Sequence, residues 1–396
     1  AEARTAYRSR IFIIFFWRHR CQRGARCVRG GQSTPEGAPH KNHAYFIVQK
    51  APSGVYFGCQ CNPQGASGKS SWPTQESETE TVEGNIGRYF AVHNLYRQWS
   101  DLASITSNST DAEISGDISQ GRVPVIALQC FENIGGANYN LEQIASGSAY
   151  NDLVSIRNAL ANLQYPPGAR LAGKAYPIVL RWFWEFNLNI TNPPPNPNNN
   201  NGCFTADPLE SPQTQFINAW NYIRNVLDPG TGIPNVTFMW NPTVAIAQSD
   251  IIPTPPSPDP FYPGVNSVDW IAFDGYSKYP TLDAPNPNTF NQVFDSSFND
   301  FSGSQWGGKP ISITETGACK EYLSPNDQAT YLRTAETQID SSSPYDAVTG
   351  AFLYFDAPGQ YQTPQGVRCH WYLDSSGLTQ FGVMGADLTF SPFVSP

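Results

Sequence analysis

The sequence predicts an α/β protein, a (β/α)8 TIM barrel with long loops on its C-terminal face. From about residue 53 onward, short apolar segments alternate with longer segments of helical period. Several of the short segments are almost wholly apolar, as parallel strands covered on both faces are. The longest Pro- and Asn-rich stretches directly follow apolar segments. A doubly wound open sheet is the alternative. That fold usually has a glycine-rich phosphate turn after its first strand, and none is visible here.

Eight short apolar segments are expected to form the barrel strands. They are Val55–Phe57, Tyr89–Val92, Val123–Leu128, Ile178–Trp184, Val236–Trp240, Trp270–Phe273, Ile311–Thr314 and Phe352–Phe355. Three amphipathic patterns between them predict helices, because apolar residues recur at three- and four-residue spacing. They are Asn151–Leu163, Thr214–Leu227 and Pro325–Ile339, the last preceded by the N-cap candidate Ser324.

Two Pro-rich segments are expected to be loops beside the functional site. Asn192–Gly202 follows the fourth expected strand, and Asn241–Tyr262 follows the fifth. In a (β/α)8 barrel, the loops after the strands form the active-site face. The alternative interpretation is that both segments are low-complexity linkers.

The first fifty residues differ from the rest of the chain. They are rich in Arg and contain one apolar run, Ile11–Trp17, which is far too short to span a bilayer. The run resembles a damaged signal peptide without a clear cleavage site. We therefore expect residues 1–50 to be a poorly structured or non-native segment, and residues 51–396 to form one catalytic (β/α)8 domain.

Composition and charge narrow the functional classes. Charged residues make up 14% of the 396 residues, against about 25% in an average soluble chain, while 34 Pro, 32 Gly and 13% aromatic residues indicate many loops. The net charge of −9 argues against binding to nucleic acid or to an anionic membrane.

Eight cysteines in a loop-rich chain favour disulfides and a secreted, extracellular protein. Free buried thiols are the alternative, and the connectivity is not predictable from the sequence. The cysteines are Cys21, Cys27, Cys59, Cys61, Cys130, Cys203, Cys319 and Cys369.

Two expected strands end abruptly in a glutamate. Ile178–Asn187 contains Glu185, and Lys309–Gly317 contains Glu315. A carboxylate at the end of a buried strand is costly to desolvate unless it opens into a cleft. In a barrel, the fourth and seventh strands lie on opposite sides of the mouth, so the two carboxyl groups are expected to face each other there.

A facing pair of carboxyl groups about 5–5.5 Å apart is what retaining glycoside hydrolysis requires. One must be ionised and the other protonated, so their surroundings must push the two pKa values apart. Trp182 or Trp184 is a candidate for the apolar surroundings of Glu185, and Arg181 or Tyr276 for the donor to Glu315. The alternative is that each glutamate is a structural ion-pair partner.

Further residues near the expected strand ends are candidates for sugar contacts, since aromatic rings stack on sugar faces and amides bind hydroxyl groups. The substrate-binding candidates are Arg181, Trp184, Asn187, Trp240, Tyr276, Trp306, Tyr354 and His93. Core packing is the alternative for each aromatic residue, and an ordinary hydrogen-bonded role for His93. No metal-ligand spacing and no phosphate loop is visible, so no metal and no cofactor is expected.

Four segments resemble motifs of clan A glycoside hydrolases, and most closely those of glycoside hydrolase family 26, the β-mannanase and β-1,3-xylanase group. They correspond to its fourth to seventh strands and are Arg181–Asn187, Asn235–Pro242, Val268–Tyr276 and Pro310–Gly317. The resemblance extends from Gly54 to the C-terminus.

The resemblance implies that Glu185 is the general acid/base, that Glu315 is the nucleophile and that Tyr276 contacts the nucleophile. The family usually has His where this chain has Trp184, and a segment with Gly and Trp where it has Leu188–Asn192. The expected protein is a secreted, monomeric retaining hydrolase of a β-linked polysaccharide or oligosaccharide, with β-mannan favoured. The alternative is a non-catalytic carbohydrate-binding barrel.

Overall fold

The structure of this chain is a computed structural model. It describes residues 48, 51, 54–61, 72–130, 139–190, 203–205, 210–228, 235–244, 257–277, 287–301, 306–321, 327–341, 344–357, 370–387 and 389–391. All of them belong to one compact unit, Ala44–Pro396. The expected loop Asn192–Gly202, most of Asn241–Tyr262 and the expected cap Ser324 lie outside the described residues.

Eight parallel strands form a closed barrel, because β1 pairs with both β8 and β2. The strands are β1 Val55–Cys61, β2 Val92–Arg97, β3 Val123–Leu128, β4 Ile178–Trp182, β5 Val236–Trp240, β6 Trp270–Ser277, β7 Ile311–Ala318 and β8 Val348–Asp356. A short strand, β9 (Phe390–Ser391), also pairs with β1. The predicted (β/α)8 fold is confirmed, and the closed pairing excludes the open sheet.

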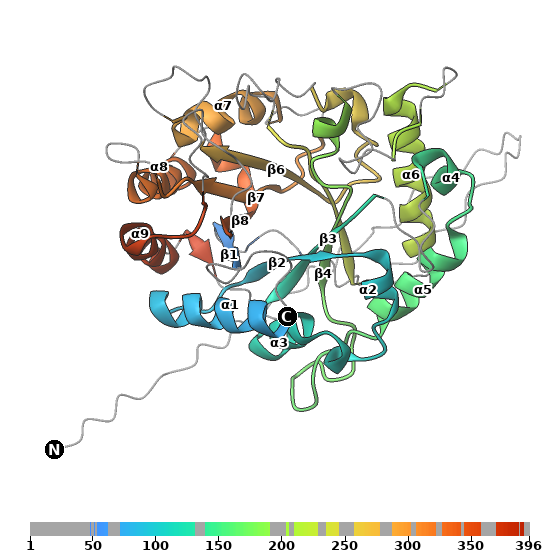
Figure 1. Cartoon of the computed structure of the whole chain (residues 1–396), viewed down its shortest axis with the longest axis horizontal. Coiled ribbons are helices and arrows are strands. Elements are labelled where there is room, and N and C mark those ends of the chain that lie inside the picture. The colour runs from blue at the N-terminus through green and yellow to red at the C-terminus, as the bar shows by residue number, and fades with distance from the viewer. Residues whose placement is uncertain are drawn as a thin grey trace, which may run out of the picture. The chain divides into compact units, whose positions relative to one another are not determined.

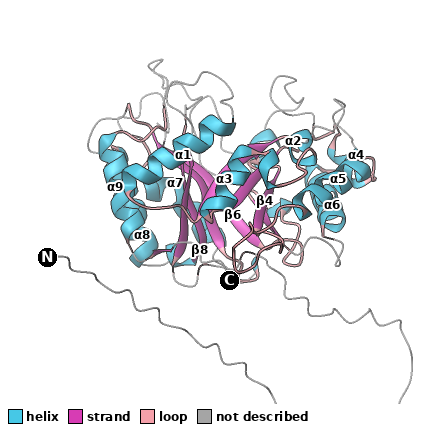
Figure 2. Ribbon diagram, turned by 90° about the horizontal axis from the view of Figure 1, so that it is seen from below, coloured by secondary structure: helices cyan, strands magenta, loops and turns pink. Residues whose placement is uncertain are grey.

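Helices surround the strands (Figures 1 and 2). They are α1 Trp72–Ile86, α2 Trp99–Ala103, α3 Ala112–Gln120, α4 Leu141–Ala145, α5 Tyr150–Ala161, α6 Pro212–Leu227, α7 Phe290–Phe301, α8 Gln328–Ser341 and α9 Ser375–Ala386. Short 3-10 turns are η1 Asn108–Thr110, η2 Phe186–Ile190, η3 Asp259–Phe261 and η5 Tyr345–Ala347. None of the helices within the described residues is long and apolar enough to cross a membrane.

Alternation along each strand divides the core into two layers. In β5, Phe238 and Trp240 belong to the large apolar layer between strands and helices, whereas Met239 belongs to the smaller layer inside the barrel. Successive side chains of a strand point to opposite faces, so this division fixes which residues reach the mouth. The inner layer also contains Val125 and Val179, one on each of two neighbouring strands.

The core begins upstream of the boundary expected at residue 51. Val48 is 2% exposed and lies in the inner layer of the barrel. Its backbone N–H donates to Thr237 Oγ1 (2.8 Å), and its carbonyl accepts from Trp270 Nε1 (3.0 Å). Val48 is not predicted, because the first fifty residues are set aside together on the Arg-rich composition of their first part.

A comparison of two truncated chains should show how much Val48 contributes to the stability of the barrel. A chain that begins at Ala51 should unfold with a free energy lower by about 2–4 kcal/mol than one that begins at Ala44, because it loses a buried Val and two hydrogen bonds. Urea denaturation of the two chains measures the difference. Equal unfolding free energies would show that Val48 does not stabilise the barrel.

The second strand was expected at Tyr89–Val92 but runs from Val92 to Arg97. Two of its three outward side chains, His93 and Arg97, are paired with carboxylates and only Leu95 is apolar, so the apolar pattern is weak. His93 Nδ1 pairs with Asp117 Oδ1 (2.9 Å), and Arg97 Nε donates to Asp111 Oδ2 (2.6 Å). His93 therefore lies within a strand and faces the helices, not the mouth.

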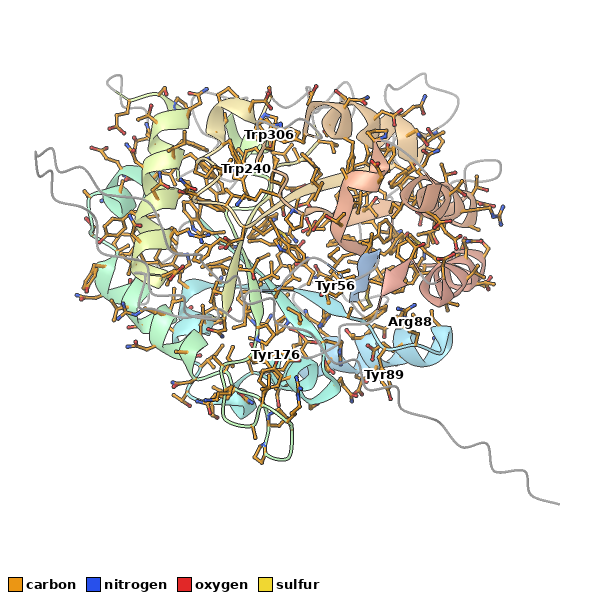
Figure 3. All side chains as sticks on the ribbon, turned by 180° about the vertical axis from the view of Figure 1, so that it is seen from behind. Tyr56, Arg88, Tyr89, Tyr176, Trp240 and Trp306 are labelled. Carbon is orange, nitrogen blue, oxygen red and sulfur yellow. A yellow bond between two sulfur atoms is a disulfide. The ribbon has the colours of Figure 1, made fainter. Side chains whose placement is uncertain are left out.

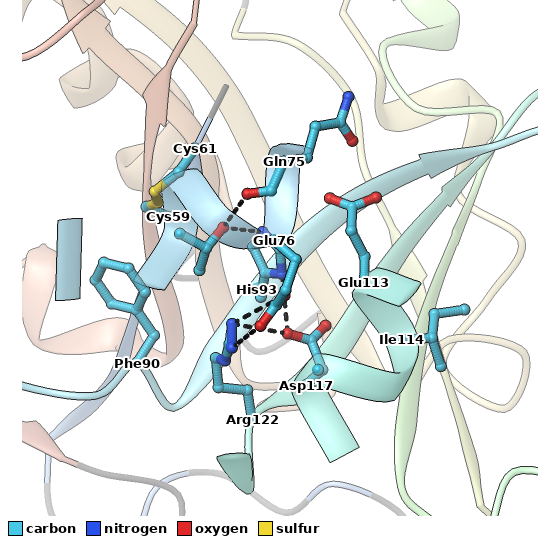
Figure 4. Close-up of polar contacts among 12 residues, drawn as sticks. Cys59, Cys61, Gln75, Glu76, Phe90, His93, Glu113, Ile114, Asp117 and Arg122 are labelled. Carbon is cyan, nitrogen blue, oxygen red and sulfur yellow. Dashed lines mark hydrogen bonds and ion pairs between the residues drawn. A yellow bond between two sulfur atoms is a disulfide. The ribbon is translucent and has the colours of Figure 1, made fainter. Parts of the chain in front are cut away.

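His93 belongs to a buried polar cluster between α1, α3 and the barrel (Figure 4). Arg122 donates to Glu76 and lies 3.2 Å from Asp117 Oδ1 and 3.6 Å from Glu83 Oε1. Burial is the largest cause that raises the pKa of both Asp117 and Glu76 to about 8, against the lowering effect of Arg122. Burial lowers the pKa of His93 to about 3, so its ring is neutral at ordinary pH.

The Asp117→Asn substitution is expected to flatten the pH dependence of stability. A carboxyl whose pKa is raised in the folded state stabilises the fold below its unfolded pKa, about 4. It loses that contribution as pH rises towards 8, at about 1.4 kcal/mol per pH unit. Urea denaturation between pH 6.5 and 8 measures the slope. This range lies above the ordinary His pKa, so the titration of His93 no longer opposes the slope that Asp117 causes. The exposed control Asp300→Asn should keep the wild-type slope, and an unchanged slope in Asp117→Asn would contradict the account.

Disulfides are present within the described residues. Cys59 pairs with Cys61 on β1, and Cys130, after β3, pairs with Cys203 in the segment before α6. Cys319, directly after β7, is also disulfide-bonded. Cys21, Cys27 and Cys369 lie outside the described residues. The second bridge links segments 73 residues apart. It therefore ties the end of β3 to a distant loop.

Candidate active site

A polar network fills the barrel above its apolar floor. Arg181 on β4 is fully buried and donates to Asn94 Oδ1 (2.9 Å), Asn241 Oδ1 (2.6 Å) and Asp274 Oδ2 (2.7 Å). These side chains come from β2, β4 and β6 and from the residue after β5. The inward positions of alternating strands therefore meet at the carboxyl end of the barrel, where parallel barrels carry their active sites.

Glu315 on β7 is the carboxylate at the centre of this network. Its Oε1 accepts from Arg181 Nη2 (2.9 Å) and from the hydroxyl of Tyr96, and its Oε2 accepts from the hydroxyl of Tyr276 (2.5 Å). Only 3% of the residue is exposed. Three donors, one of them cationic, therefore hold both oxygens of the carboxyl group in place.

A β-bulge brings Glu315 to the inner face. Phe273 pairs with Ile313, but its neighbour Asp274 pairs with Glu315, so Thr314 is an extra residue on β7. The Thr314 hydroxyl contacts Asn241 Oδ1 (3.2 Å) and donates to Asp274 Oδ1 (2.7 Å). Two successive residues of β7 therefore reach the interior. Bulges re-aim side chains in this way beside active sites.

Glu185 lies on the turn that follows β4 and is partly exposed. Phe183 and Glu185 have φ angles of 52° and 53°, in the left-handed region, which costs about 1–3 kcal/mol for each residue. The turn is held by hydrogen bonds from Phe183 N to the Leu128 carbonyl (2.9 Å) and from Glu185 N to the Asn241 carbonyl (2.8 Å). Neighbouring strand ends therefore fix the position of Glu185.

Three carboxyl groups meet at the mouth. One oxygen from each of Glu185, Asp274 and Glu315 lies within 4.8 Å of the other two. The pair that the sequence analysis expected to face each other, Glu185 and Glu315, is thus brought together from β7 and the turn after β4. The spacing fits the separation of about 5–5.5 Å that retaining glycosidases require.

Burial controls the titration of the groups around Glu315. Burial, followed by the Glu315 charge, raises the pKa of Tyr96 and of Tyr276 well above the usual range. Both phenols therefore remain protonated donors. Burial also raises the pKa of Asp274, against the lowering effect of Arg181. Burial lowers the pKa of Arg181, but its two carboxylate partners outweigh that effect, so the guanidinium stays charged.

Aromatic side chains flank the three carboxyl groups. The ring of Trp184, which precedes Glu185, packs on Tyr96 with centroids 5.1 Å apart. On the other side, Tyr276 stacks on Trp371 (4.9 Å) and meets Phe355 edge to face. Tyr96 is not among the predicted site residues, because the second strand was expected to end at Val92. Trp371 is not among them either, because it does not lie at the end of a strand.

Four of the predicted substrate-binding residues, Trp240, Trp306, Tyr354 and His93, lie on the helix side of the barrel and not with the glutamates. Trp240 and Trp306 are buried in an aromatic cluster on the helix side of β5 (Figure 3), with ring centroids 6.2 Å apart. Tyr354 is buried against Phe381 of α9. Trp240 and Tyr354 lie near the ends of β5 and β8 but point outward from the barrel, whereas Trp306 precedes β7.

Asn187 and His93 also have structural partners. Asn187 is buried, and its amide exchanges hydrogen bonds with the backbone of Thr243 (2.9 and 3.0 Å), which ties the turn after β4 to the segment after β5. His93 contacts Asp117 and Thr79. Of the residues predicted to bind substrate, Arg181, Trp184 and Tyr276 lie beside the glutamates.

Two sets of described residues have ligand atoms close enough for a metal ion. They are Glu185, Asp274 and Glu315 at the mouth, and Glu76, His93 and Asp117 in the buried cluster. In each set, an arginine lies close to two of the carboxylates: Arg181 at the mouth and Arg122 in the cluster. A guanidinium thus supplies positive charge in both places.

The fold and the site define a (β/α)8 barrel in which two glutamates, one after the fourth strand and one on the seventh, meet at the mouth. No family model matches the chain, and no curated protein matches it in sequence. Solved structures resemble it in fold. The catalytic domain of a family 26 endo-β-1,4-mannanase from Bacillus sp. JAMB-750 superposes with a TM-score of 0.57 at 14% identity, over 86% of this chain and 88% of that one.

Two further family 26 structures are similar. An endo-β-1,4-mannanase from Cellulomonas fimi has a TM-score of 0.51 at 16% identity, over 86% of this chain and 73% of its own. A β-mannanase from Bacteroides ovatus has a TM-score of 0.52 at 14% identity, over 86% and 91%. The likeness to family 26 that the motifs indicate therefore extends over most of the fold.

Proposed function

We propose that the protein is a retaining glycoside hydrolase that cleaves a β-linked polysaccharide, with β-mannan as the first candidate. One observation carries the proposal: Glu185 and Glu315 bring carboxyl oxygens within 4.8 Å of each other at the mouth of the barrel. The similar solved structures support the choice of substrate, because their names describe endo-β-1,4-mannanases.

Glu315 is the nucleophile in this proposal. Tyr96, Arg181 and Tyr276 donate hydrogen bonds to its two carboxyl oxygens. The same three contacts hold both carboxylate oxygens in fixed positions, so the attacking atom is oriented before substrate binds.

Glu185 is the general acid/base. Its carboxyl group lies beside the Glu315 charge, and a second negative charge at this distance is unfavourable, which favours a proton on Glu185. Its partial exposure at the rim leaves it accessible to a leaving-group oxygen and later to water. The position on a strained, braced turn fits a group that must meet a particular atom of the substrate.

The two glutamates then complete a double displacement. Glu315 attacks the anomeric carbon while Glu185 protonates the departing glycosidic oxygen, which gives a covalent glycosyl-enzyme. Glu185, now a carboxylate, takes a proton from water, and that water displaces Glu315 from the anomeric carbon. The product keeps the configuration of the substrate.

A non-catalytic carbohydrate-binding barrel is the second candidate, because Trp184 replaces the residue that family 26 usually has before its acid/base. Release of reducing ends from mannan, xylan and mixed-linkage glucan tests both candidates. The proposal expects release from at least one of them, with mannan the best substrate. Retention of a polysaccharide on an affinity gel without any release of reducing ends would favour the binding protein.

The proposal includes a secreted, monomeric enzyme. The Cys59–Cys61 and Cys130–Cys203 bridges support an oxidising compartment, because such bonds persist mainly outside the cytosol. Size-exclusion chromatography with light scattering tests the monomer, and a mass near 43.6 kDa is expected.

A further inference from the structure

The two oxygens of Glu315 have different surroundings. Oε1 accepts from Tyr96 and from Arg181 (2.9 Å), which occupy both of its in-plane lone pairs. Among the described residues, Oε2 accepts a hydrogen bond from Tyr276 alone (2.5 Å). One lone pair of Oε2 therefore remains for another partner, whereas Oε1 has none to offer without losing a donor.

The Tyr96 hydroxyl reaches Glu315 Oε1 from the side of the mouth where Glu185 lies. Tyr96 lies on β2, two residues after Asn94, so both side chains point inward. Its ring packs against Trp184 with centroids 5.1 Å apart and an interplanar angle of 57°. Because Trp184 directly precedes Glu185, the Tyr96 ring joins the turn of the acid/base to the nucleophile.

We infer that Tyr96, braced by Trp184, is a positioning residue that fixes Oε1 as the oxygen that becomes the ester carbonyl, so that Glu315 attacks through Oε2. This inference rests on the proposed hydrolase function. In the first step, Oε2 donates an electron pair to the anomeric carbon and the bond to the leaving oxygen breaks. That oxygen takes the proton of Glu185. Oε1 becomes the carbonyl oxygen and keeps its bonds to Tyr96 and Arg181.

The two half-reactions respond differently to loss of the Tyr96 hydroxyl. In the second step, Glu315 leaves as a carboxylate, and donors on Oε1 stabilise the charge that develops. Without Tyr96 this step slows. In the first step, a carboxylate with one donor fewer is a stronger base and a better nucleophile, so attack is largely spared. The Tyr276 hydroxyl orients the attacking oxygen itself, so its loss misplaces that atom and slows both steps.

Kinetics with 2,4-dinitrophenyl β-mannobioside test the inference, because its leaving group needs no protonation and the second step limits turnover. Tyr96→Phe should lower kcat by about 10- to 100-fold, the effect of one hydrogen bond to a charged group. KM should fall in parallel, so that kcat/KM stays within about threefold of wild type. A pre-steady-state burst of dinitrophenolate in both the wild type and Tyr96→Phe would show that the second step limits turnover, and Tyr276→Phe should lower kcat/KM as well.

A matched control is Tyr331→Phe. The Tyr331 hydroxyl bonds Thr316 Oγ1 (2.6 Å), next to Glu315 in sequence but on the helix side of β7. Both kinetic constants should stay at wild-type values in this variant. Equal losses of kcat and kcat/KM in Tyr96→Phe, or kinetics like those of Tyr331→Phe, would overturn the inference.

A readout without substrate separates failure of this inference from failure of the proposed function. The Tyr96 hydroxyl proton, buried on a carboxylate, should give a downfield resonance in the proton NMR spectrum that Tyr96→Phe removes. Trp184→Leu should shift or broaden it while the Tyr276 resonance persists. If the wild type releases no reducing ends from mannan, xylan or mixed-linkage glucan, the inferred attack through Oε2 falls with the hydrolase proposal. An unchanged Tyr96 resonance in Trp184→Leu would overturn the bracing role even in an active enzyme.

Discussion

Glu315→Ala is expected to lower turnover by about 10⁵-fold or more on every substrate, the scale on which loss of a nucleophile acts in other covalent enzymes. Glu315 is the carboxylate on which Tyr96, Arg181 and Tyr276 converge, so its removal deletes the attacking atom and leaves those donors without their acceptor. Steady-state release of reducing ends and of dinitrophenolate measures the loss.

Rescue by azide tests whether the group lost in Glu315→Ala is the nucleophile. In Glu315→Ala the anion can enter the space of the lost carboxylate and attack once, so any rescued product is a glycosyl azide of inverted configuration. Glu142→Ala, on the exposed side of α4, is the control and should keep wild-type turnover. Full activity in Glu315→Ala would contradict the assignment of the nucleophile.

Glu185→Ala is expected to have the second-largest effect, and the size should depend on the leaving group. Proton transfer contributes about 10²- to 10⁴-fold, so hydrolysis of polysaccharide should fall by that factor. The kcat/KM for a dinitrophenyl glycoside should change little, because its leaving group departs without a proton. Parallel measurements on the two substrates check this difference.

Azide separates the two glutamates here as well. In Glu185→Ala it should attack the glycosyl-enzyme that Glu315 still forms and give an azide of retained configuration. Exchange of the two phenotypes between the variants would mean that the roles are reversed while the double displacement holds. Equal losses on both substrates in Glu185→Ala would argue against a proton-transfer role.

Much of the barrel was predictable because apolar strands are easy to recognise. The strands Val123–Leu128 and Val236–Trp240 have the bounds that the sequence predicts. The second strand was placed too early, because its outward residues His93 and Arg97 are buried through ionic partners on α3 and before it. Apolar periodicity cannot reveal a strand whose outer face is buried by charge pairing.

The centre of the site was predictable to a similar degree. Arg181 and Tyr276 contact Glu315 as expected, because strand ends and motif spacing place them at the mouth. Trp240 was expected there but faces the helices. Nearness to a strand end does not decide whether a side chain faces the barrel interior or the helices. Its place in the inward and outward alternation of the strand decides this, together with any bulge. The bulge at Thr314, which turns both that residue and Glu315 inward, has no signature in the sequence.

The stereochemistry of hydrolysis tests the central claim most directly. Proton NMR of the first product released from a β-linked substrate, recorded before the anomers equilibrate, reports whether the configuration is kept. The spacing of Glu185 and Glu315 predicts that the β-anomer appears first and the α-anomer grows in later by mutarotation. Initial release of the α-anomer would mean direct displacement by water, and would contradict the assignment of Glu315 as a nucleophile.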